Sequence, residues 1–443
     1  MNNEFINLAR QSFLAYCHII DPLFKHNWHH VKMCKVLEKI ARGESKRVIF
    51  SLPPQHGKTY FVTQRFPTFY FGRNPKSNII STSYSQQYAE DSGTFVKSMM
   101  MTDEYKRIFN LQITQSTKSK KRFSLVNGGN YYAVGRGGTI TGRGAQLIII
   151  DDLIKNNHEA MSKKYRDAMI DWYKNTLRTR LRKNGSIIII QTRWHQNDLI
   201  GYLLKDSSED WENIVFPAIS EKNEALWHEL YELEHLEAIR KEMGSLAFEG
   251  LYQQKPALQD GFYIKDDWIQ RYDIPPKVIE DSIITFDLTF KGDEQSDWVV
   301  GQYWVKSANN FFLIDMIRGK WDFTKQLFHM KQFIANHINC GNIVIEDSAN
   351  ASAIFSVIKQ NVSGIKLWKP KTSKESRLQS VAPLFEAKNI YIPKEQKYDD
   401  LVTELLGFPN MEHDDTVDAC TMALLNLRKQ SLGMVMSLGE RIF

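Results

Sequence analysis

The stretch that decides the fold is Ser51-Leu-Pro-Pro-Gln-His-Gly-Lys-Thr59, which follows the apolar run Arg47-Val-Ile-Phe50. A loop that binds nucleotide phosphates needs backbone N–H groups around the phosphates, a lysine on the terminal phosphates and a hydroxyl on Mg²⁺. Gly57, Lys58 and Thr59 supply these last three positions at the turn from a predicted strand to a predicted helix. The stretch therefore predicts a P-loop that binds ATP with Mg²⁺.

The loop departs from the usual pattern at one position, because Leu52 stands where Gly is common. Gly-Lys-Thr alone is a weak signal, and an ordinary loop lysine is the alternative interpretation. Pro53-Pro54 stiffens the start of the loop, and Gln55 and His56 complete it. The preceding apolar strand and the next motif favour the nucleotide-binding interpretation.

A second motif, Leu147-Ile-Ile-Ile-Asp-Asp152, predicts a buried strand with two carboxylates at its C-terminal end. In open α/β sheets ligands bind at these strand ends. We assign Asp151 to the Mg²⁺ ion and Asp152 to the water that attacks the γ-phosphate. Glu159 is the alternative for the second role.

Two further stretches belong to the same predicted domain. Gly135-Arg-Gly-Gly-Thr-Ile-Thr-Gly-Arg-Gly144 is dense in glycine, which predicts backbone close to a ligand or to a neighbouring subunit, with a flexible hairpin as the alternative. Arg136 and Arg143 are available there to meet phosphate charge. The strand Ile187-Ile-Ile-Ile-Gln-Thr-Arg-Trp-His195 ends in polar residues, of which Thr192 or Gln191 can sense the γ-phosphate.

Short apolar runs alternate with amphipathic stretches from residue 46 onward, which predicts a mostly parallel sheet covered on both faces. Residues 1–45 have helical periodicity, and Pro and Gly punctuate residues 253–276. We predict an α/β protein with these parts: a helical lead-in (1–45), a P-loop ATPase domain of the ASCE type (46–252), a linker (253–276) and a second domain (277–443). The expected strands of the first domain are 47–52, 78–84, 146–150 and 186–192, and its expected helices include 88–101 and 162–181.

The second domain places acids where a metal-dependent nuclease needs them. Two-metal cleavage of a phosphodiester requires three or more carboxylates around cations about 4 Å apart. The runs 282–288, 299–305 and 311–317 predict an antiparallel meander, followed by a helix at 324–337 and a strand at 342–345. Asp287 ends the first strand, Glu346 ends the last, and His413-Asp-Asp-Thr-Val-Asp418 opens a late helix.

This order of acids is typical of an RNase H-like sheet. Each acid alone also has a structural explanation, because Asp is favoured at helix starts and strand ends. Asp414 is a candidate N-cap, and Asp297 a candidate turn residue. Their order along the chain favours convergence on one site.

Composition agrees with this interpretation without proving it. The net charge is +6, from 57 Lys and Arg against 51 Asp and Glu, which is compatible with a polyanionic partner but common among unrelated proteins. The four cysteines have no paired spacing for zinc or disulfides. No run approaches the ~20 apolar residues of a membrane span, and the N-terminus lacks a signal-peptide core. We expect an intracellular protein without a membrane partner.

The motifs, in this order, resemble the large terminase subunit of tailed bacteriophages, a family that packages viral DNA into an empty procapsid. The resemblance extends over nearly the whole chain, including Phe24-Lys-His-Asn-Trp-His-His30, similar to the family's segment near the nucleotide base, and the ending His413-Asp-Asp-Thr-Val-Asp-Ala419. It implies ATP-driven translocation of double-stranded DNA, and endonuclease cutting of concatemers with Mg²⁺ or Mn²⁺. The implied partners are the small terminase subunit and the portal of the procapsid, in the host cytoplasm. On the portal a ring of identical subunits is expected, with a monomer in solution as the alternative.

The resemblance also implies roles for single residues. Lys58 and Thr59 hold phosphate and Mg²⁺, Asp151 and Asp152 form the acidic pair, and Thr192 lies in the coupling motif. An arginine acts in the neighbouring subunit's site, Arg143 being the first choice and Arg136 the second. Family members often have Arg at the position of Gln55, so a second basic phosphate contact is missing here. The implied metal ligands are Asp287, Glu346 and Asp415, with Asp414, Asp347 and Asp418 as alternatives.

Three other functions fit part of the sequence. A helicase–nuclease of DNA repair or recombination would explain both sites, but it usually has a second ATPase-like domain, and residues 276–443 contain no phosphate-binding motif. A transposase or integrase would explain the acids only. A structural DNA-binding protein would not need the intact acids and Lys58. The basic stretch 366–377 is a candidate contact for the DNA backbone or a solvated surface.

Overall fold

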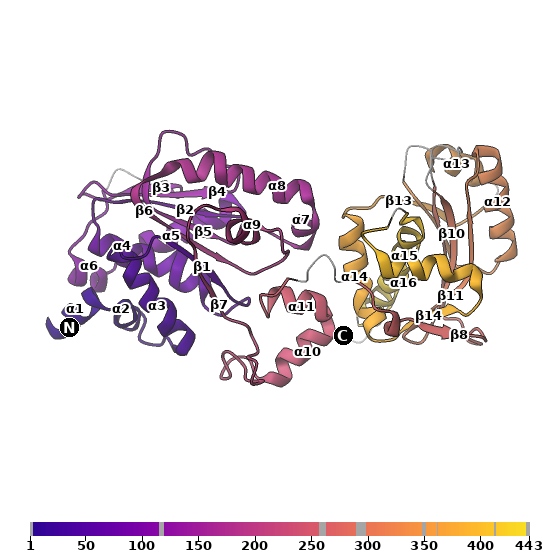
Figure 1. Cartoon of the computed structure of the whole chain (residues 1–443), viewed down its shortest axis with the longest axis horizontal. Helices are drawn as coiled ribbons and strands as arrows, with labels where there is room; N and C mark the ends of the chain where they lie inside the picture. The colour runs from indigo at the N-terminus through magenta and orange to yellow at the C-terminus, as the bar shows by residue number, and fades with distance from the viewer. Residues whose placement is uncertain are drawn as a thin grey trace. The chain divides into compact units, whose positions relative to one another are not determined.

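The computed structural model describes residues 3–114, 119–256, 263–288, 298–347, 351–360, 362–411 and 413–439, with the backbone alone from 429. The chain consists of two compact units (Figure 1). Unit 1 comprises Met1–Arg240 and Ala247–Leu258, and unit 2 comprises Lys241–Leu246 and Gln259–Phe443. Part of the predicted linker, residues 257–262, and the candidate turn residue Asp297 lie outside the described residues.

Unit 1 is built on a seven-stranded sheet with the order β3-β4-β2-β5-β6-β1-β7. All its neighbouring strands are parallel except β3 and β4, so the predicted mostly parallel sheet is confirmed. The strands are β1 (Arg47–Ser51), β2 (Asn78–Ser83), β3 (Arg122–Ser124), β4 (Asn130–Gly135), β5 (Ala145–Asp151), β6 (Leu181–Gln191) and β7 (Glu212–Val215).

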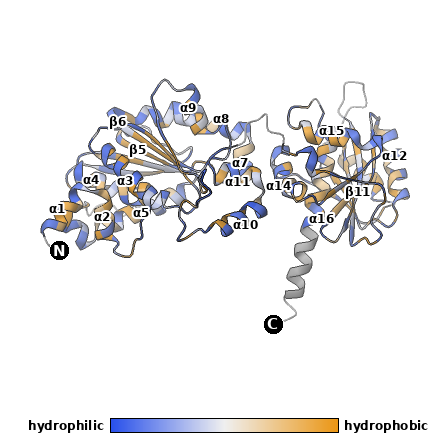
Figure 2. Cartoon of the chain, turned by 60° about the horizontal axis from the view of Figure 1, so that its bottom comes forward, coloured by the Kyte–Doolittle hydropathy of each residue, from blue (hydrophilic) through white to orange (hydrophobic). Residues whose placement is uncertain are grey.

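The sheet is buried on both faces. Alternate side chains of each strand point to opposite sides, and the apolar side chains of each side enter a hydrophobic cluster. In β5, Leu147 and Ile149 belong to one hydrophobic cluster, whereas Ile148 and Ile150 belong to another. Strand β5 is accordingly orange in Figure 2, while the surrounding helices mix blue and orange. This explains why the strand sequences are continuous apolar runs rather than alternating patterns.

The helices of unit 1 begin with three at the N-terminus, as the periodicity of residues 1–45 indicates. Asn27 precedes helix α3 and caps it with its side chain, while the His30 side chain accepts a hydrogen bond from the Asn27 backbone. The helices are α1 (Asn3–Gln11), α2 (Phe13–Ile20), α3 (Trp28–Ala41), α4 (Phe66–Arg73), α5 (Gln86–Met100), α6 (Asp103–Phe109), α7 (Asn157–Met161), α8 (Lys163–Trp172) and α9 (Leu199–Asp206). Helices α10 (Leu233–Met243) and α11 (Ser245–Leu251) follow, and residues 241–246 of this stretch belong to unit 2.

The expected helix 162–181 is α-helical only to Trp172. It continues as a π-helix, Tyr173–Leu177, and a 3₁₀ turn, Arg178–Arg180, before β6 begins. The widening and tightening of these turns let the chain pass directly from the helix into a strand that starts at Leu181.

Unit 2 is built on a second seven-stranded sheet, with the order β13-β12-β9-β10-β11-β14-β8. The predicted antiparallel meander β9-β10-β11 is confirmed, and β12 joins β9 in parallel. The strands are β8 (Gln270–Tyr272), β9 (Asp281–Asp287), β10 (Val299–Ser307), β11 (Asn310–Gly319), β12 (Asn342–Glu346), β13 (Ile365–Trp368) and β14 (Ile390–Pro393). The helices are α12 (Phe323–Asn336), α13 (Ala351–Ile358), α14 (Lys374–Glu386), α15 (Asp399–Gly407) and α16 (Asp415–Gly439).

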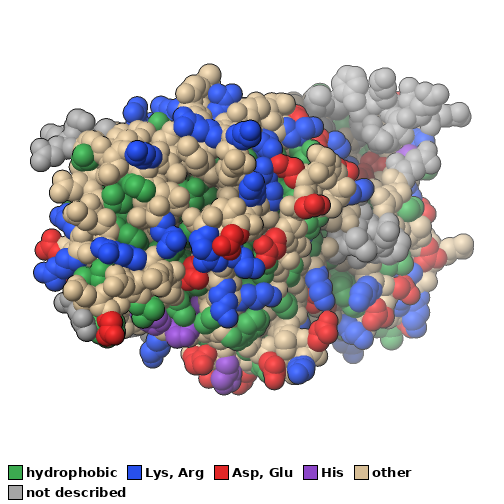
Figure 3. All heavy atoms as spheres, turned by 60° about the vertical axis from the view of Figure 1, so that its left-hand side comes forward, with side chains coloured by type: hydrophobic (Ala, Val, Ile, Leu, Met, Phe, Trp, Pro, Cys, Tyr) green, Lys and Arg blue, Asp and Glu red, His purple; other side chains and the backbone are tan. Residues whose placement is uncertain are grey.

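Two properties of the whole molecule bear on its partners. Among the described helices, none combines the length and the apolar character that crossing a bilayer requires. On the face shown in Figure 3, Lys and Arg side chains are spread over the surface and interspersed with Asp and Glu. This distribution agrees with the modest net charge of +6.

Candidate active sites

The loop after β1 lies at the C-terminal edge of the sheet of unit 1, where parallel α/β sheets bind their ligands. It leads into a π-helix, η1 (Thr59–Arg65), which continues as α4. Strand β6 lies between β1 and β5, with Ser51 beside Gln191 and Ile190 beside Asp151. The sheet therefore brings the ends of these three strands together.

Gly57 has a φ of +86°, and only a glycine fits there. A Cβ atom at Gly57 would lie 2.7 Å from Nε2 of the buried His30. The Asn27 N–H donates to Nδ1 of His30 at 3.0 Å, so the ring proton is on Nε2, which faces the His56 carbonyl oxygen at 3.3 Å. His30 thus supports the loop backbone at His56 and Gly57.

His30 is one of three buried imidazoles near the loop, with His29 and His56. Burial lowers the pKa of His30 to about 4 and that of His29 to about 3, and it also lowers the pKa of His56. These side chains are therefore neutral at physiological pH. The imidazole of His56 stacks on Tyr231 at 4.7 Å, and the Tyr231 hydroxyl donates to Oε1 of Gln55 at 2.8 Å.

The Asp151 carboxylate accepts hydrogen bonds from two hydroxyl groups of the helix that follows the loop. Thr63 donates to Oδ2 at 2.7 Å and Thr59 to Oδ1 at 3.4 Å. The two threonines are four residues apart on the π-helix, whose wider turn is common at functional sites. Burial, together with the charge of Asp152, raises the pKa of Asp151 to about 7. A buried carboxylate next to a second carboxylate and a threonine hydroxyl fits a Mg²⁺ ion.

Asp152 connects the loop after β1 to the end of β6. Its Oδ2 lies 3.0 Å from Nζ of Lys58, and its Oδ1 accepts from the backbone N–H and hydroxyl of Thr192 at 3.0 and 3.3 Å. The backbone of Asp152 has a φ of +41°, a strained conformation for a non-glycine residue and one that concentrates at functional sites. Lys58, Asp152 and Thr192 therefore form one connected group.

The alternatives left open by the sequence have different surroundings. Arg136 binds Glu159 through both nitrogens, at 2.7 and 2.9 Å, and donates to the Leu153 carbonyl. Glu159 also accepts from the Lys155 N–H at 3.0 Å. Arg143 has its guanidinium 4.9 Å from the Tyr132 ring centroid, and among the described residues it forms no ion pair. Arg136 and Glu159 are thus bound to each other, and Arg143 is not bound in this way.

A cavity of about 780 Å³ adjoins the loop. Its walls come from the segment before α3, from the loop and the residue that follows it, and from a segment before α10: Leu23, Phe24, Lys25, His26, Gln55, Gly57, Tyr60, Trp227, Glu229 and Leu230. The lining is largely apolar with few polar groups, as is usual for small-molecule sites.

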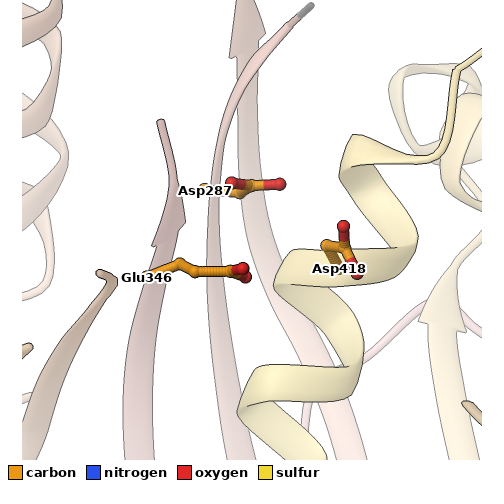
Figure 4. A group of neighbouring side chains, drawn as sticks. All are labelled: Asp287, Glu346 and Asp418. Atoms are coloured by element: carbon orange, nitrogen blue, oxygen red, sulfur yellow. The ribbon is translucent and has the colours of Figure 1, made fainter. Parts of the chain in front are cut away.

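In unit 2, three carboxylates meet at the ends of β9 and β12 and on α16 (Figure 4). Oxygens of Asp287, Glu346 and Asp418 lie within 4.8 Å of one another. Parallel pairing puts Ile345 beside Phe286, so the following residues, Glu346 and Asp287, leave the sheet at the same end. Helix α16 is fixed against the sheet because Thr285 donates to the Ala419 carbonyl at 2.9 Å.

Burial and mutual repulsion raise the pKa values of acids in this cluster. Burial raises the pKa of Asp287 well above its ordinary value, and Asp418, Glu346 and Asp415 raise it further. Burial also raises the pKa of Glu346, whose Oε2 is buried and has no hydrogen-bond partner among the residues that the structure describes. Three oxygen donors and this buried Oε2 fit divalent cations, which prefer carboxylate ligands.

The other acids of this region lie differently. Asp414 is 2.6 Å from Nζ of Lys374, and Oδ2 of Asp415 accepts from the Trp298 N–H at 3.2 Å. Asp347 is exposed, and its N–H donates to the Trp368 carbonyl. The structure therefore brings together Asp287 and Glu346, as expected, with Asp418 rather than Asp415 as the third member of the group.

Two basic residues of the stretch 366–377 face the acids. Lys374 and Arg377, on the first turn of α14, both bind Asp418. The sequence indicated a DNA contact or a solvated surface for this stretch, and the pairing of these two cations with the acids was not foreseen. Thr63 was also missed, and His30 was placed only in a segment near the nucleotide base, without its contact with the loop. A signal existed only for α14, where two cations are spaced three residues apart between the second and third acids.

Comparison with known proteins gives two family models that match in sequence order. The model described as "Terminase large subunit, T4likevirus-type, N-terminal" matches residues 49–271, and "Terminase RNaseH-like domain" matches residues 284–427. The matches contain Lys58, Asp151 and Asp152 in the first case and all three clustered acids in the second. The predicted RNase H-like class of the second domain is thereby confirmed. No curated protein matches the chain.

Solved structures of phage terminases are similar to the chain at low sequence identity. The large terminase of a thermophilic bacteriophage is 12% identical, with 88% of this chain and 89% of that chain covered and a TM-score of 0.44. An ATPase-domain mutant of the large terminase of Thermus phage P74-26 is 16% identical, with 54% and 96% covered and a TM-score of 0.38. The large terminase nuclease of the thermophilic phage G20c with bound magnesium is 16% identical, with 36% and 93% covered and a TM-score of 0.29.

Proposed function

Because the chain belongs to the terminase large subunit family, we propose that it is the motor and nuclease subunit of a phage DNA-packaging machine. It couples ATP hydrolysis in unit 1 to the translocation of double-stranded DNA into a procapsid, and it cuts concatemeric DNA in unit 2. The observation that carries this proposal is the presence in one chain of the Lys58–Asp152 pair, 3.0 Å apart, and the group of Asp287, Glu346 and Asp418.

In unit 1, the loop backbone around Gly57 binds the phosphates of ATP, and the Lys58 ammonium binds the terminal ones. Asp151 and Thr59 hold Mg²⁺, which neutralises phosphate charge when bound. Thr192 holds Oδ1 of Asp152 in place. Oδ2 of Asp152 then orients the attacking water. The cavity of about 780 Å³ beside the loop accommodates the base, between Phe24 and Trp227.

Asp152 is the better choice than Glu159 for the catalytic acid. Glu159 is occupied by Arg136 through two hydrogen bonds. The same pairing leaves Arg143 as the better choice for an arginine that reaches a neighbouring subunit, since its guanidinium forms no ion pair with the described residues and lies over the Tyr132 ring. An arginine supplied in trans stabilises the charge of the transferred phosphoryl group.

In unit 2, Asp287, Glu346 and Asp418 hold two divalent cations, Mg²⁺ or Mn²⁺, with Asp414 and Asp415 beside them. When bound, these ions activate a water and stabilise the leaving oxygen of the phosphodiester. The chain's own residues position the cations: β9 and β12 supply two ligands in register, and α16 supplies the third from a helix fixed by Thr285.

The proposed partners follow from the same role. They are double-stranded DNA, the small terminase subunit and the portal of the procapsid, on which several copies of the chain form a ring. The site of action is the host cytoplasm, where procapsids are filled.

The test is the filling of procapsids with linear DNA, measured as DNA protected from added nuclease, with and without ATP. The proposal expects protection that needs ATP and disappears in Lys58→Ala. A chain that unwinds duplex DNA with ATP, but protects none in the presence of procapsids, would instead be a helicase–nuclease.

A further inference from the structure

The Lys374 side chain lies directly on the acidic group of unit 2. Its Nζ is 2.6 Å from Oδ1 of Asp414 and 2.6 Å from Oδ2 of Asp418. Lys374 is the first residue of α14, after the capping residue Ser373. Its side chain is 45% exposed, whereas that of Asp418 is 3% exposed. A lysine whose flexible side chain is half exposed thus neutralises a buried carboxylate.

Arg377 binds the other oxygen of Asp418 but has a different environment. Its Nη2 pairs with Oδ1 of Asp418 and lies 3.8 Å from Oε2 of Glu346. The Arg377 side chain is 3% exposed and packs over the Trp368 ring. Arg377 is therefore enclosed, while Lys374, one helical turn before it, has a free path to solvent.

Both oxygens of Asp418 consequently carry a cation that belongs to the protein. Asp287, Glu346 and Asp418 would otherwise place three negative charges within 4.8 Å of one another. Like charges at this distance disfavour the ionised group. The ion pairs of Lys374 and Arg377 with Asp418 offset part of this repulsion.

We propose that the Lys374 ammonium is a displaceable counter-cation: it holds the nuclease carboxylates in place until a divalent cation binds, and that cation must displace it from Asp418. Arg377 stays where it is and keeps Asp418 and Glu346 oriented. The inference rests on the proposed nuclease function. It makes Lys374 a positioning residue that sets how much metal the nuclease site needs.

Removal of Lys374 then has two opposite effects. Without its competitor, a divalent cation binds more tightly, and a difference of about 1.4 kcal/mol in the competing ion pair corresponds to a tenfold change in Kd. Without its counter-charge, the metal-free protein is less stable, because the carboxylates repel one another. If Lys374 only supported the fold, its removal would lower both the metal affinity and the stability of the protein.

The experiment is calorimetric titration of the nucleotide-free full chain with Mn²⁺, in wild type and in variants at unchanged pH and salt. Asp287→Asn identifies the heat that belongs to the nuclease site. Lys374→Met should tighten the Kd for Mn²⁺ about tenfold and lower the melting temperature in EDTA. Lys374→Arg, which keeps the charge, should stay near the wild-type Kd. Lys371→Met is the matched control, since it removes the same charge from an exposed lysine just before the helix.

Unchanged or weaker Mn²⁺ binding by folded Lys374→Met would overturn the inference and leave the proposed function intact. If Lys374→Met does not fold, Lys374→Gln and Lys374→Arg are compared, and equal Kd values in the two overturn it as well. If the wild-type heat does not depend on Asp287, the nuclease site itself is wrongly assigned. Tightening by Lys371→Met to the same extent would show a general charge effect and would also contradict a specific role for Lys374.

Discussion

Nζ of Lys58 lies 3.0 Å from Oδ2 of Asp152, so the loop after β1 is joined to the end of β5 across the intervening strand β6. The same carboxylate accepts two hydrogen bonds from Thr192, at the end of β6. In the proposed function, a terminal phosphate that attracts the Lys58 ammonium would free one oxygen of Asp152 for water, while Thr192 would still hold the other. The proposal therefore expects phosphate binding to prepare Asp152 for catalysis.

Replacement of Lys58 tests the phosphate loop. Lys58→Ala should abolish ATP hydrolysis, because the charge that stabilises the β- and γ-phosphates is lost. Cleavage of plasmid DNA with Mn²⁺ should survive in the same preparation, since the carboxylates lie in another unit. Retention of full ATPase activity by this variant would show that the loop is not the nucleotide site.

Complementation tests the arginine. Arg143→Ala and Asp152→Asn should each be inactive as ATPases, and a mixture of the two should regain part of the activity, because one subunit supplies each intact group. Arg136→Ala should instead lower the melting temperature, since it leaves Glu159 without its two-point partner. An absence of recovery at every mixing ratio, with both variants assembling, would count against action in trans.

Two glycines with positive φ separate backbone strain from the close contact in the loop. Gly57→Ala introduces a Cβ 2.7 Å from Nε2 of His30, whereas nothing lies within 4 Å of a Cβ at Gly43. Each change costs about 1 kcal/mol of backbone strain in the free energy of unfolding. Only Gly57→Ala should also weaken nucleotide affinity, by about tenfold or more for a loop displacement worth ~1.4 kcal/mol. Equal nucleotide affinities in the two variants would contradict the role given to His30.

The buried imidazoles predict acid sensitivity of unit 1. The folded-state pKa of His29 is lowered to about 3 from an ordinary 6.5, so the folded protein binds fewer protons than the unfolded chain between these values. The stabilisation is present above pH 6.5 and is lost as pH falls, by roughly 3 kcal/mol at pH 4. His29→Phe should flatten the fall of the unfolding free energy with pH in denaturant titrations. His228→Gln, at an exposed site, should keep the wild-type slope.

Much of the fold could be predicted because the strands are simple patterns. The runs Leu147–Ile150 and Ile187–Ile190 are continuously apolar, which is typical of strands in a parallel sheet buried on both faces. The acids that follow these and later runs are at strand ends, and parallel pairing then brings strand ends together. This reasoning placed Asp151, Asp287 and Glu346 at strand ends, and the resemblance to the terminase family implied Asp287 and Glu346 as metal ligands.

The remaining features depend on geometry that no local pattern encodes. The π-helical turn that brings Thr63 to Asp151 adds one residue to a turn, and no sequence signal marks it. The choice between Asp415 and Asp418 depends on how α16 is rotated against the sheet, and this rotation is set by distant contacts such as Thr285 with Ala419. Pairing of Lys374 with Asp418 joins residues that are 44 positions apart, which composition cannot show.

The central claim is that Asp287, Glu346 and Asp418 act together to hold metal. It is tested most directly by plasmid cleavage in Mn²⁺, with Asp418→Asn and Asp415→Asn measured side by side. ATPase activity is measured on the same preparations. Asp418→Asn should eliminate cleavage as completely as Asp287→Asn or Glu346→Gln, with ATPase retained, because each removes a negative charge from the site. Asp415→Asn should keep measurable cleavage, since its carboxylate accepts from the Trp298 N–H. Wild-type cleavage by Asp418→Asn, together with loss of cleavage in Asp415→Asn, would contradict the account.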